Sequence, residues 1–336
     1  MSTTSSRTSV AVIHCGGTIS NIPLDPYDYF AYVDHAELMP IDRLVELLAP
    51  AATDVELIPM QFSAKGSTAF GPSDWLALGK RIHEVVEEHP DITGIVVLHG
   101  TASLEETAYF LDLTLKVDVP VVVTGAMRPP GTQGSDAPVN LRNAIRTAMH
   151  PGSRGLGVLV VFDEGIYAAR DVTKGSTYRV DAFHGPDLGM LGRTDWDEIT
   201  FFGRSSRRHA PHSAFDVRAI QAVPRVDIVA AYPGADAVPI EALVTSGTRG
   251  IVLAGMGAGF GTPEQKRALL HAIRLGVRVV LSNRTGSGRV LRTPTMRQEG
   301  FVTGDSLSPQ KAMVLTMVAL TRNPSTEQLQ RWFSEH

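Results

Sequence analysis

The 336-residue sequence contains one cysteine, Cys15, and no apolar run long enough to span a bilayer. A single cysteine cannot form an internal disulfide, which fits a reducing cytoplasm, and the apolar run after the polar first residues is too short for a signal-peptide core. With a net charge of −4, the chain also lacks the positive charge that favours binding to nucleic acid or anionic membranes. We therefore expect a cytoplasmic protein with neither nucleic acid nor a membrane as partner.

Several familiar catalytic and cofactor motifs are absent or incomplete. No G-x-S-x-G elbow is present, so a serine hydrolase of the α/β type has no support. The GMGAG stretch at 255–259 resembles a dinucleotide-binding loop. The acidic residue expected about 20 positions later, at the end of the next strand, is missing, and Asn283 lies nearest to that position. The HEVVE stretch at 83–87 lacks a second histidine at the zinc spacing, and its amphipathic pattern indicates a solvated helix face. The sequence thus predicts neither a metal nor an organic cofactor.

The clearest unit of structure is the stretch 93–112, TGIVVLHGTASLEETAYFLD. The β-branched run 94–98 predicts a strand buried on both faces, the residues 99–101 end it, and a helix is expected after Ser103. Ser103 is expected to cap this helix with Glu106 as its capping-box partner. This pattern places a hydroxyl and free N–H groups at the carboxyl edge of a parallel sheet, where open α/β folds bind ligands, although an ordinary connecting turn has the same pattern.

Strands and helices alternate in this way to about residue 165, which predicts a larger N-terminal domain with a doubly wound, mostly parallel sheet. An irregular region follows, and then a second, smaller α/β domain. We expect an N-terminal catalytic α/β domain at 1–208, a linker at 209–224 and a smaller C-terminal α/β domain at 225–336. The residues 21–40 show no period and predict a loop. The expected strands are 10–14, 54–60, 94–98, 120–124, 157–162, 226–231, 250–254 and 277–281, and further helices are expected at 43–48, 74–88, 140–148 and 309–320.

Two threonines stand just after predicted strands, and a lysine is a candidate partner for them. The strand 10–14 runs into GGTIS at 16–20, where paired glycines allow a tight turn and close approach to Thr18. Thr101 follows the next clear strand in the same way. A hydroxyl is a poor nucleophile until a base takes its proton, and Lys174 could be that base if burial lowers its pKa. Because lysines are rarely buried, the residue type alone favours a surface position for Lys174.

Six motifs, in order and over nearly the whole chain, resemble the type I/II L-asparaginase (asparaginase/glutaminase) family. They are GGTIS at 16–20, VVLHGTASLEETAYFLDLTLK at 96–116, PVVVTGAMRP at 120–129, NLRNAI at 140–145, RDVTK at 170–174 and GIVLAGMGAG at 250–259. The resemblance implies an amidohydrolase with a small-molecule amide substrate, no cofactor, and a larger and a smaller α/β domain. It also implies a homotetramer or homodimer whose sites lie near a subunit interface.

The resemblance also implies roles for individual residues. Thr18 matches the nucleophile, which attacks an amide carbonyl to give an acyl-enzyme that water then hydrolyses. Thr101 and Lys174 match the threonine and lysine that manage protons. The loop tyrosine that helps to activate the nucleophile corresponds best to Tyr32, with Tyr27 and Tyr29 as alternatives.

The substrate-binding positions combine one match with clear departures. Ser67 matches the carboxylate-binding serine, and the backbone N–H of Ala102, in the turn with Gly100, is a candidate oxyanion donor. The family motif HGTD, however, reads HGTA here, so Ala102 replaces the aspartate that holds the substrate ammonium. Thr68 replaces the glutamine that follows the serine. The family's G-N-G-N loop reads GAGF at 257–260, and the stretch 284–297 offers no acidic residue for the glutamate that reaches in from a partner subunit.

These departures bear on the substrate, because every group that would pair with an ammonium is missing together. A buried ammonium without a carboxylate costs several kcal/mol. The sequence therefore predicts a threonine amidohydrolase acting on an amide or cyclic amide without a free α-amino group. The alternatives are an ordinary L-asparaginase, which converts L-asparagine to L-aspartate and ammonia, and a catalytically silent relative that binds a small ligand.

Overall fold

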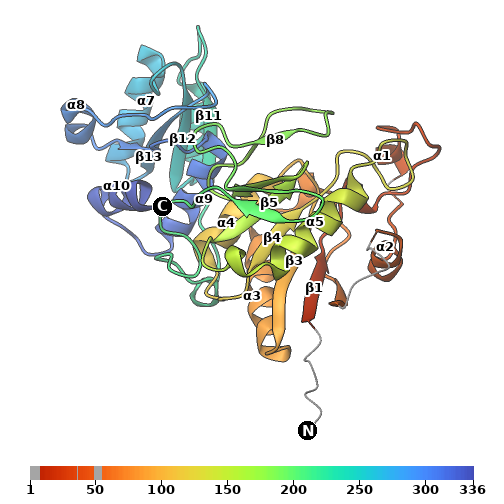
Figure 1. Cartoon of the computed structure of the whole chain (residues 1–336). Helices are drawn as coiled ribbons and strands as arrows, with labels where there is room; N and C mark the ends of the chain where they lie inside the picture. The colour runs from red at the N-terminus through yellow and green to blue at the C-terminus, as the bar shows by residue number, and fades with distance from the viewer. Residues whose placement is uncertain (1–7, 36, 49–54) are drawn as a thin grey trace. The chain divides into compact units, whose positions relative to one another are not determined.

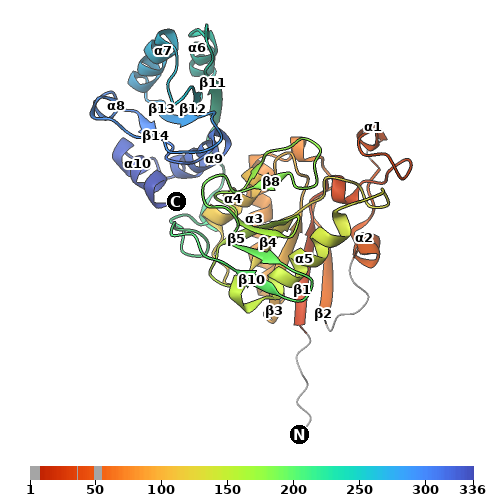
Figure 2. The same cartoon turned by 45° about the horizontal axis from the view of Figure 1, so that its top comes forward.

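The structure is a computed structural model that describes residues 8–35, 37–48 and 55–336. Contacts divide the chain into two units, one ending at Ser213 and one spanning Ala214–His336. Figures 1 and 2 show each unit built around its own sheet. A larger, mostly parallel N-terminal sheet and a smaller C-terminal α/β unit confirm the predicted fold class. Among the described residues, no helix is both long and apolar enough to cross a membrane.

The strands of the first unit confirm the predicted apolar runs and add an antiparallel edge. They are β1 Thr8–His14, β2 Val55–Gln61, β3 Ile92–Leu98, β4 Val121–Thr124, β5 Val158–Phe162, β6 Gly165–Ala168, β7 Thr173–Lys174, β8 Phe183–His184, β9 Gly192–Thr194 and β10 Ile199–Phe201. The helices are α1 Tyr32–His35, α2 Ile41–Leu48, α3 Pro72–Glu88, α4 Leu104–Thr114 and α5 Ala137–Met149, with short 3₁₀ turns at Thr18–Ser20, Ser67–Ala69 and Pro151–Ser153. Asp54, the first residue of one predicted strand, lies outside the described residues.

The eight-stranded sheet has the order β10-β9-β6-β5-β4-β3-β1-β2, and its strands from β2 to β5 are parallel. After β1 the chain moves outward to β2 and then returns to form β3 on the other side of β1. The carboxyl ends of β1 and β3 therefore lie at a point where the strand order reverses. In open α/β sheets, ligands bind in the crevice at such a point.

Apolar residues of the central strands pack against helices and fix this edge in place. Helices α2 and α5 share one hydrophobic core with β1, β3, β4 and β5, in which Val12, Val96 and Leu141 are fully buried. Helices α3 and α4 pack against each other through Trp75 and Phe110, whose stacked rings lie 5.7 Å apart. The strands buried between these layers are β-branched almost throughout, as a two-sided core requires.

The second unit contains a four-stranded parallel sheet in the order β11-β12-β13-β14. Its strands are β11 Val226–Ala230, β12 Gly250–Gly255, β13 Arg278–Asn283 and β14 Val302–Thr303; its helices are α6 Val238–Thr245, α7 Pro263–Arg274, α8 Pro294–Gln298, α9 Pro309–Leu320 and α10 Thr326–Glu335, and Val217–Ala219 forms a 3₁₀ turn. The prediction of helix 309–320 is confirmed, whereas α8, β14 and α10 were not predicted.

Two predicted irregular stretches are more ordered than expected. The stretch 21–40, predicted as a loop, contains α1 and a bridge between Asn21 and Leu38. The predicted linker 209–224 includes Phe215, which is 1% exposed and packs edge-on against Trp332 at 5.0 Å between ring centroids. Part of that stretch thus belongs to the core of the second unit.

Candidate active site

Two loops meet at the carboxyl ends of β1 and β3, and only glycine fits where they touch. Gly17 has a φ of 98°, and a Cβ atom there would lie 2.2 Å from the Cα atom of Gly100. A Cβ atom on Gly100 would lie 2.7 Å from the side chain of Ser67. Backbone atoms of Gly100 and the side chain of Ser67 therefore occupy the space that side chains at Gly17 and Gly100 would need. This contact brings Thr18 and Thr101, the residues that follow the two glycines, onto adjoining loops.

The first hydroxyl, Thr18 Oγ1, lies 2.9 Å from the phenolic oxygen of Tyr32. Tyr32 begins α1 and is buried, and burial raises the pKa of its phenol. Of the alternatives, Tyr27 is 72% exposed, and Tyr29 donates its hydroxyl to the carbonyl of Gln133. Tyr32 is thus the tyrosine that the structure brings to Thr18.

Asp28 holds the tyrosine segment in shape and was missed by sequence reasoning. Its carboxylate accepts the backbone N–H groups of Leu24, Phe30 and Tyr32 at 3.0, 3.3 and 3.1 Å. These hydrogen bonds lower the pKa of the Asp28 carboxyl, so it stays ionised. An aspartate among turn residues just before a short helix is the signal that could have identified it.

The second hydroxyl, Thr101 Oγ1, accepts a hydrogen bond of 2.7 Å from Lys174 Nζ. Lys174 lies in β7, which pairs with β8 as a hairpin, and its side chain is half-buried rather than on the open surface as its residue type suggested. Burial lowers the pKa of the Lys174 ammonium, and the negative charge of Glu105 partly opposes this shift. Thr101 therefore contacts an amine that loses its proton more readily than an ordinary lysine.

The substrate-binding candidates lie around the same turn. The backbone N–H of Ala102, predicted as an oxyanion donor, donates to Ser67 Oγ at 3.3 Å. Ser103 directly precedes α4, but its side chain does not cap the helix; its hydroxyl donates instead to the carbonyl of Ser67 at 2.7 Å. The predicted capping box is therefore wrong, because the Ser103 hydroxyl is directed to a carbonyl in another loop and does not accept a helix N–H. Ala102 and Thr68 are both exposed, and neither carries a charge.

Other motifs do not form alternative sites. The GMGAG loop closes on itself, because the N–H groups of Gly259 and Phe260 donate to the carbonyl of Met256 and a Cβ on Gly255 would lie 2.3 Å from Gly259. Two backbone N–H groups of the loop are therefore already hydrogen-bonded within the loop itself. His83 is buried, not on a solvated face, and its Nδ1 lies 2.8 Å from the carbonyl of Gly79. No cluster of potential metal ligands occurs among the described residues.

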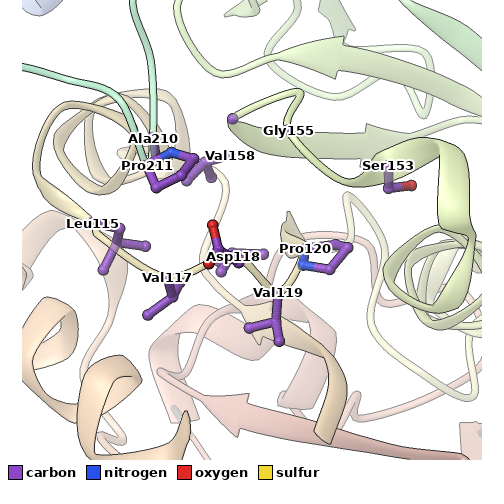
Figure 3. A pocket seen from close by; sticks show the side chains of 12 residues that line it. Leu115, Val117, Asp118, Val119, Pro120, Ser153, Gly155, Val158, Ala210 and Pro211 are labelled. Atoms are coloured by element: carbon purple, nitrogen blue, oxygen red, sulfur yellow. The ribbon is translucent and has the colours of Figure 1, made fainter.

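Figure 3 shows a small hollow at the opposite edge of the sheet, where β4 and β5 begin. Its volume is ≈ 10 Å³, and Asp118, Pro120, Gly155 and Pro211 are among its lining residues. A cavity of this size has room for about one water molecule. The hollow is therefore too small to hold a small-molecule substrate, unlike a site at the strand ends beside Thr18 and Thr101.

Comparisons with known proteins agree over nearly the whole chain. The family model "Asparaginase, N-terminal" matches residues 9–207, and "Glutaminase/Asparaginase C-terminal domain" matches residues 225–333. The chain is 35% identical to L-asparaginase 2 of Bacillus subtilis (strain 168), covering 98% of this chain and 86% of the relative. It is 38% identical to L-asparaginase 2 of Escherichia coli (strain K12), covering 81% and 78%.

A solved structure gives the same result. The crystal structure of a probable cytoplasmic L-asparaginase from Campylobacter jejuni matches with a TM-score of 0.93 and 34% identity. The match covers 98% of this chain and 100% of that one.

Proposed function

This chain belongs to the asparaginase family of amidohydrolases, and from that premise we propose that its substrate is an amide or cyclic amide without a free α-amino group. The observation that carries the proposal is a pair of hydroxyl contacts, Thr18–Tyr32 and Thr101–Lys174, on loops that touch. Catalytic groups are thus retained beside an exposed alanine at position 102, where the family motif has an aspartate.

The proposed reaction begins at Thr18. Its oxygen attacks the amide carbonyl carbon while its proton leaves, and the C–N bond breaks. The nitrogen takes up a proton and departs as ammonia from an open-chain amide, or remains attached as the amine or carboxamide end of an opened ring. Water then cleaves the acyl-threonine ester and restores the hydroxyl. Because burial raises the pKa of Tyr32, this phenol keeps its proton at neutral pH and orients Thr18 without acting as the free base.

Lys174 is the group in this site suited to accept the proton. Its pKa is lowered by burial, which increases the fraction of neutral amine at a given pH. Thr101, which it contacts, carries the proton between the reacting atoms and the amine. Ser67, beside the Ala102 N–H, supplies a hydroxyl for the acyl part of the substrate.

The substrate preference follows from charge. An ammonium bound beside Ala102 would lose part of its hydration without meeting a carboxylate, a cost that a neutral amide avoids. The names of the relatives favour a second candidate, L-asparaginase itself, with the ammonium held by other groups.

The test compares substrate pairs that differ only in the ammonium: L-asparagine against succinamic acid and L-glutamine against glutaramic acid, with succinimide and glutarimide as cyclic amides. We expect the members without an ammonium to be turned over faster, and Thr18→Val to abolish turnover while Thr245→Val, on α6, does not. Preference for asparagine would support the second candidate. No turnover of any amide by folded protein would indicate a silent binding relative.

We also propose a homodimer or homotetramer in the cytoplasm. The similar Campylobacter jejuni structure is that of a probable cytoplasmic L-asparaginase, which supports that location, while a Haemophilus influenzae relative, 35% identical, is named a probable periplasmic L-asparaginase. Light scattering after size exclusion tests the assembly, and fractionation of the source cells tests the location.

A further inference from the structure

A chain of buried hydrogen bonds runs from α3 through α4 to the turn that precedes Thr101. Trp75 Nε1 donates to Thr107 Oγ1 at 2.9 Å, Thr107 Oγ1 lies 3.1 Å from His99 Nε2, and His99 Nδ1 lies 2.8 Å from the carbonyl oxygen of Gly100. The three side chains are 4%, 0% and 1% exposed. None of them has a part in the reaction proposed above.

The donor and acceptor roles in this chain have one consistent assignment. The Trp75 indole can only donate, and the Gly100 carbonyl can only accept, so His99 Nδ1 carries a proton. Burial lowers the pKa of His99 to about 4, so the ring is neutral near pH 7 and Nε2 is unprotonated. The Thr107 hydroxyl therefore donates to Nε2, and all the hydrogen bonds run from Trp75 toward Gly100.

The last hydrogen bond orients a peptide group of the site. In a trans peptide the C=O and the following N–H point in opposite directions. When the Gly100 carbonyl is held toward the buried His99 ring, the Thr101 N–H points the opposite way. This orientation fixes the position of the Thr101 Cα atom, from which the side chain extends. The Cα atom of Gly100 also lies against Gly17, so the same peptide supports the loop that carries Thr18.

Aromatic contacts keep the chain in place. The Phe70 ring meets His99 edge-on at 4.7 Å between centroids, and Trp75 stacks on Phe110. Water is thus excluded from the His99 ring, where a competing hydrogen bond would release the Gly100 carbonyl.

We propose that Trp75, Thr107 and His99 are positioning residues, which align Thr101 with Lys174 and with Thr18 by holding the Gly100 peptide. The proposal rests on the proposed function for its kinetic consequences, but not for its hydrogen-bond assignment. Misplacing a reacting group by about 1 Å can cost as much as 10²-fold in rate.

The kinetic test uses matched threonine substitutions on one helix. Thr107→Val removes the link to His99, whereas Thr114→Val removes a hydroxyl, also fully buried, that donates to the carbonyl of Phe110 at 2.7 Å. With the best amide substrate, we expect Thr107→Val to lower kcat about tenfold or more with KM within about twofold, and Thr107→Ser to restore it. Thr114→Val should lower the unfolding temperature without lowering kcat. Equal kcat losses in both valine variants, or none in either, would overturn the proposal.

If Thr107→Val does not fold, Trp75→Phe is the replacement test, because it keeps an aromatic ring packed on Phe110 and removes only the N–H donor. A smaller fall in kcat at unchanged KM is expected, and no change would contradict the proposal.

A substrate-free readout separates this proposal from the proposed function. In ¹⁵N-histidine spectra at pH 7, with the His99 signal assigned by its loss in His99→Gln, we expect a protonated Nδ1 and an unprotonated Nε2. The Nε2 resonance should shift in Thr107→Val and stay in place in Thr114→Val. A protonated Nε2 in the wild type would overturn the assignment, whereas absence of turnover on every amide would refute only the proposed function.

Discussion

Replacing Lys174 by methionine removes the amine while keeping most of the side-chain volume. The amine donates to Thr101 Oγ1 at 2.7 Å, so its loss removes the proposed base. General acid–base groups contribute about 10²- to 10⁴-fold, or about 3–5 kcal/mol of transition-state stabilisation. We expect kcat to fall by that factor, measured by ammonia release from the best open-chain amide.

The unfolding temperature of Lys174→Met should not fall with its kcat. Burial lowers the pKa of Lys174, which means that the folded state disfavours its charge relative to the unfolded chain. Lys174→Met should therefore leave the unfolding temperature unchanged or raised. Lys266→Met is the matched control, because Lys266 is half-exposed and paired with Glu299 at 2.7 Å in the second unit.

The pH profile adds a second readout. Activity of the wild type should rise with pH as Lys174 loses its proton, and Glu105→Gln should move this rise to lower pH, since the Glu105 charge raises the pKa of Lys174. A Lys174→Met variant that changes only KM, or a profile that Glu105→Gln does not move, would refute the role of Lys174 as the base.

Two further predictions concern the tyrosine and the buried histidine. Tyr32→Phe should lower kcat about tenfold or more in steady-state assays while changing the free energy of unfolding by only about 1 kcal/mol, the net value of one hydrogen bond; an unchanged kcat would exclude Tyr32 from the site. Burial lowers the pKa of His99 from its ordinary value of 6.5 to about 4 in the folded state. Between these two pH values the unfolded chain binds more protons than the folded protein. The free energy of unfolding should therefore fall by up to about 3 kcal/mol as the pH is lowered from 6.5 to 4. Urea titrations at several pH values measure this fall, and an equal slope in His99→Gln would show that His99 does not cause it.

Much of the fold was predictable because its signals are local. The strand β3 is a run of β-branched residues with a glycine, and α9 begins with a serine cap before Pro309, so both can be recognised without knowing what packs on them. The second unit's α10 was not predicted, although Ser325 before it is a typical helix cap and Leu329, Trp332 and Phe333 have the spacing of one buried helix face.

The site was less predictable, because its contacts join residues far apart in sequence. Lys174 meets Thr101 across 73 residues, and only the β7–β8 hairpin brings it there, so residue statistics favoured the surface. Ser103 has a perfect capping pattern, yet its hydroxyl donates to a carbonyl 36 residues earlier. The choice among three tyrosines likewise depends on how Asp28 folds the segment before α1.

The most direct test of the substrate proposal is whether Ala102→Asp shifts the substrate preference from succinamic acid toward L-asparagine. Two unit charges 4 Å apart near a protein surface attract by about 4 kcal/mol, so a carboxylate at position 102 should favour an ammonium-bearing substrate strongly. The measurement is kcat/KM for L-asparagine and for succinamic acid in the wild type, in Ala102→Asp and in the uncharged control Ala102→Asn.

We expect the wild type to prefer succinamic acid, Ala102→Asp to shift the kcat/KM ratio toward asparagine by about tenfold or more, and Ala102→Asn to leave that ratio unshifted. A wild type that already hydrolyses asparagine with kcat/KM above about 10⁴ M⁻¹s⁻¹, the lower end for competent enzymes, would contradict the substrate proposal.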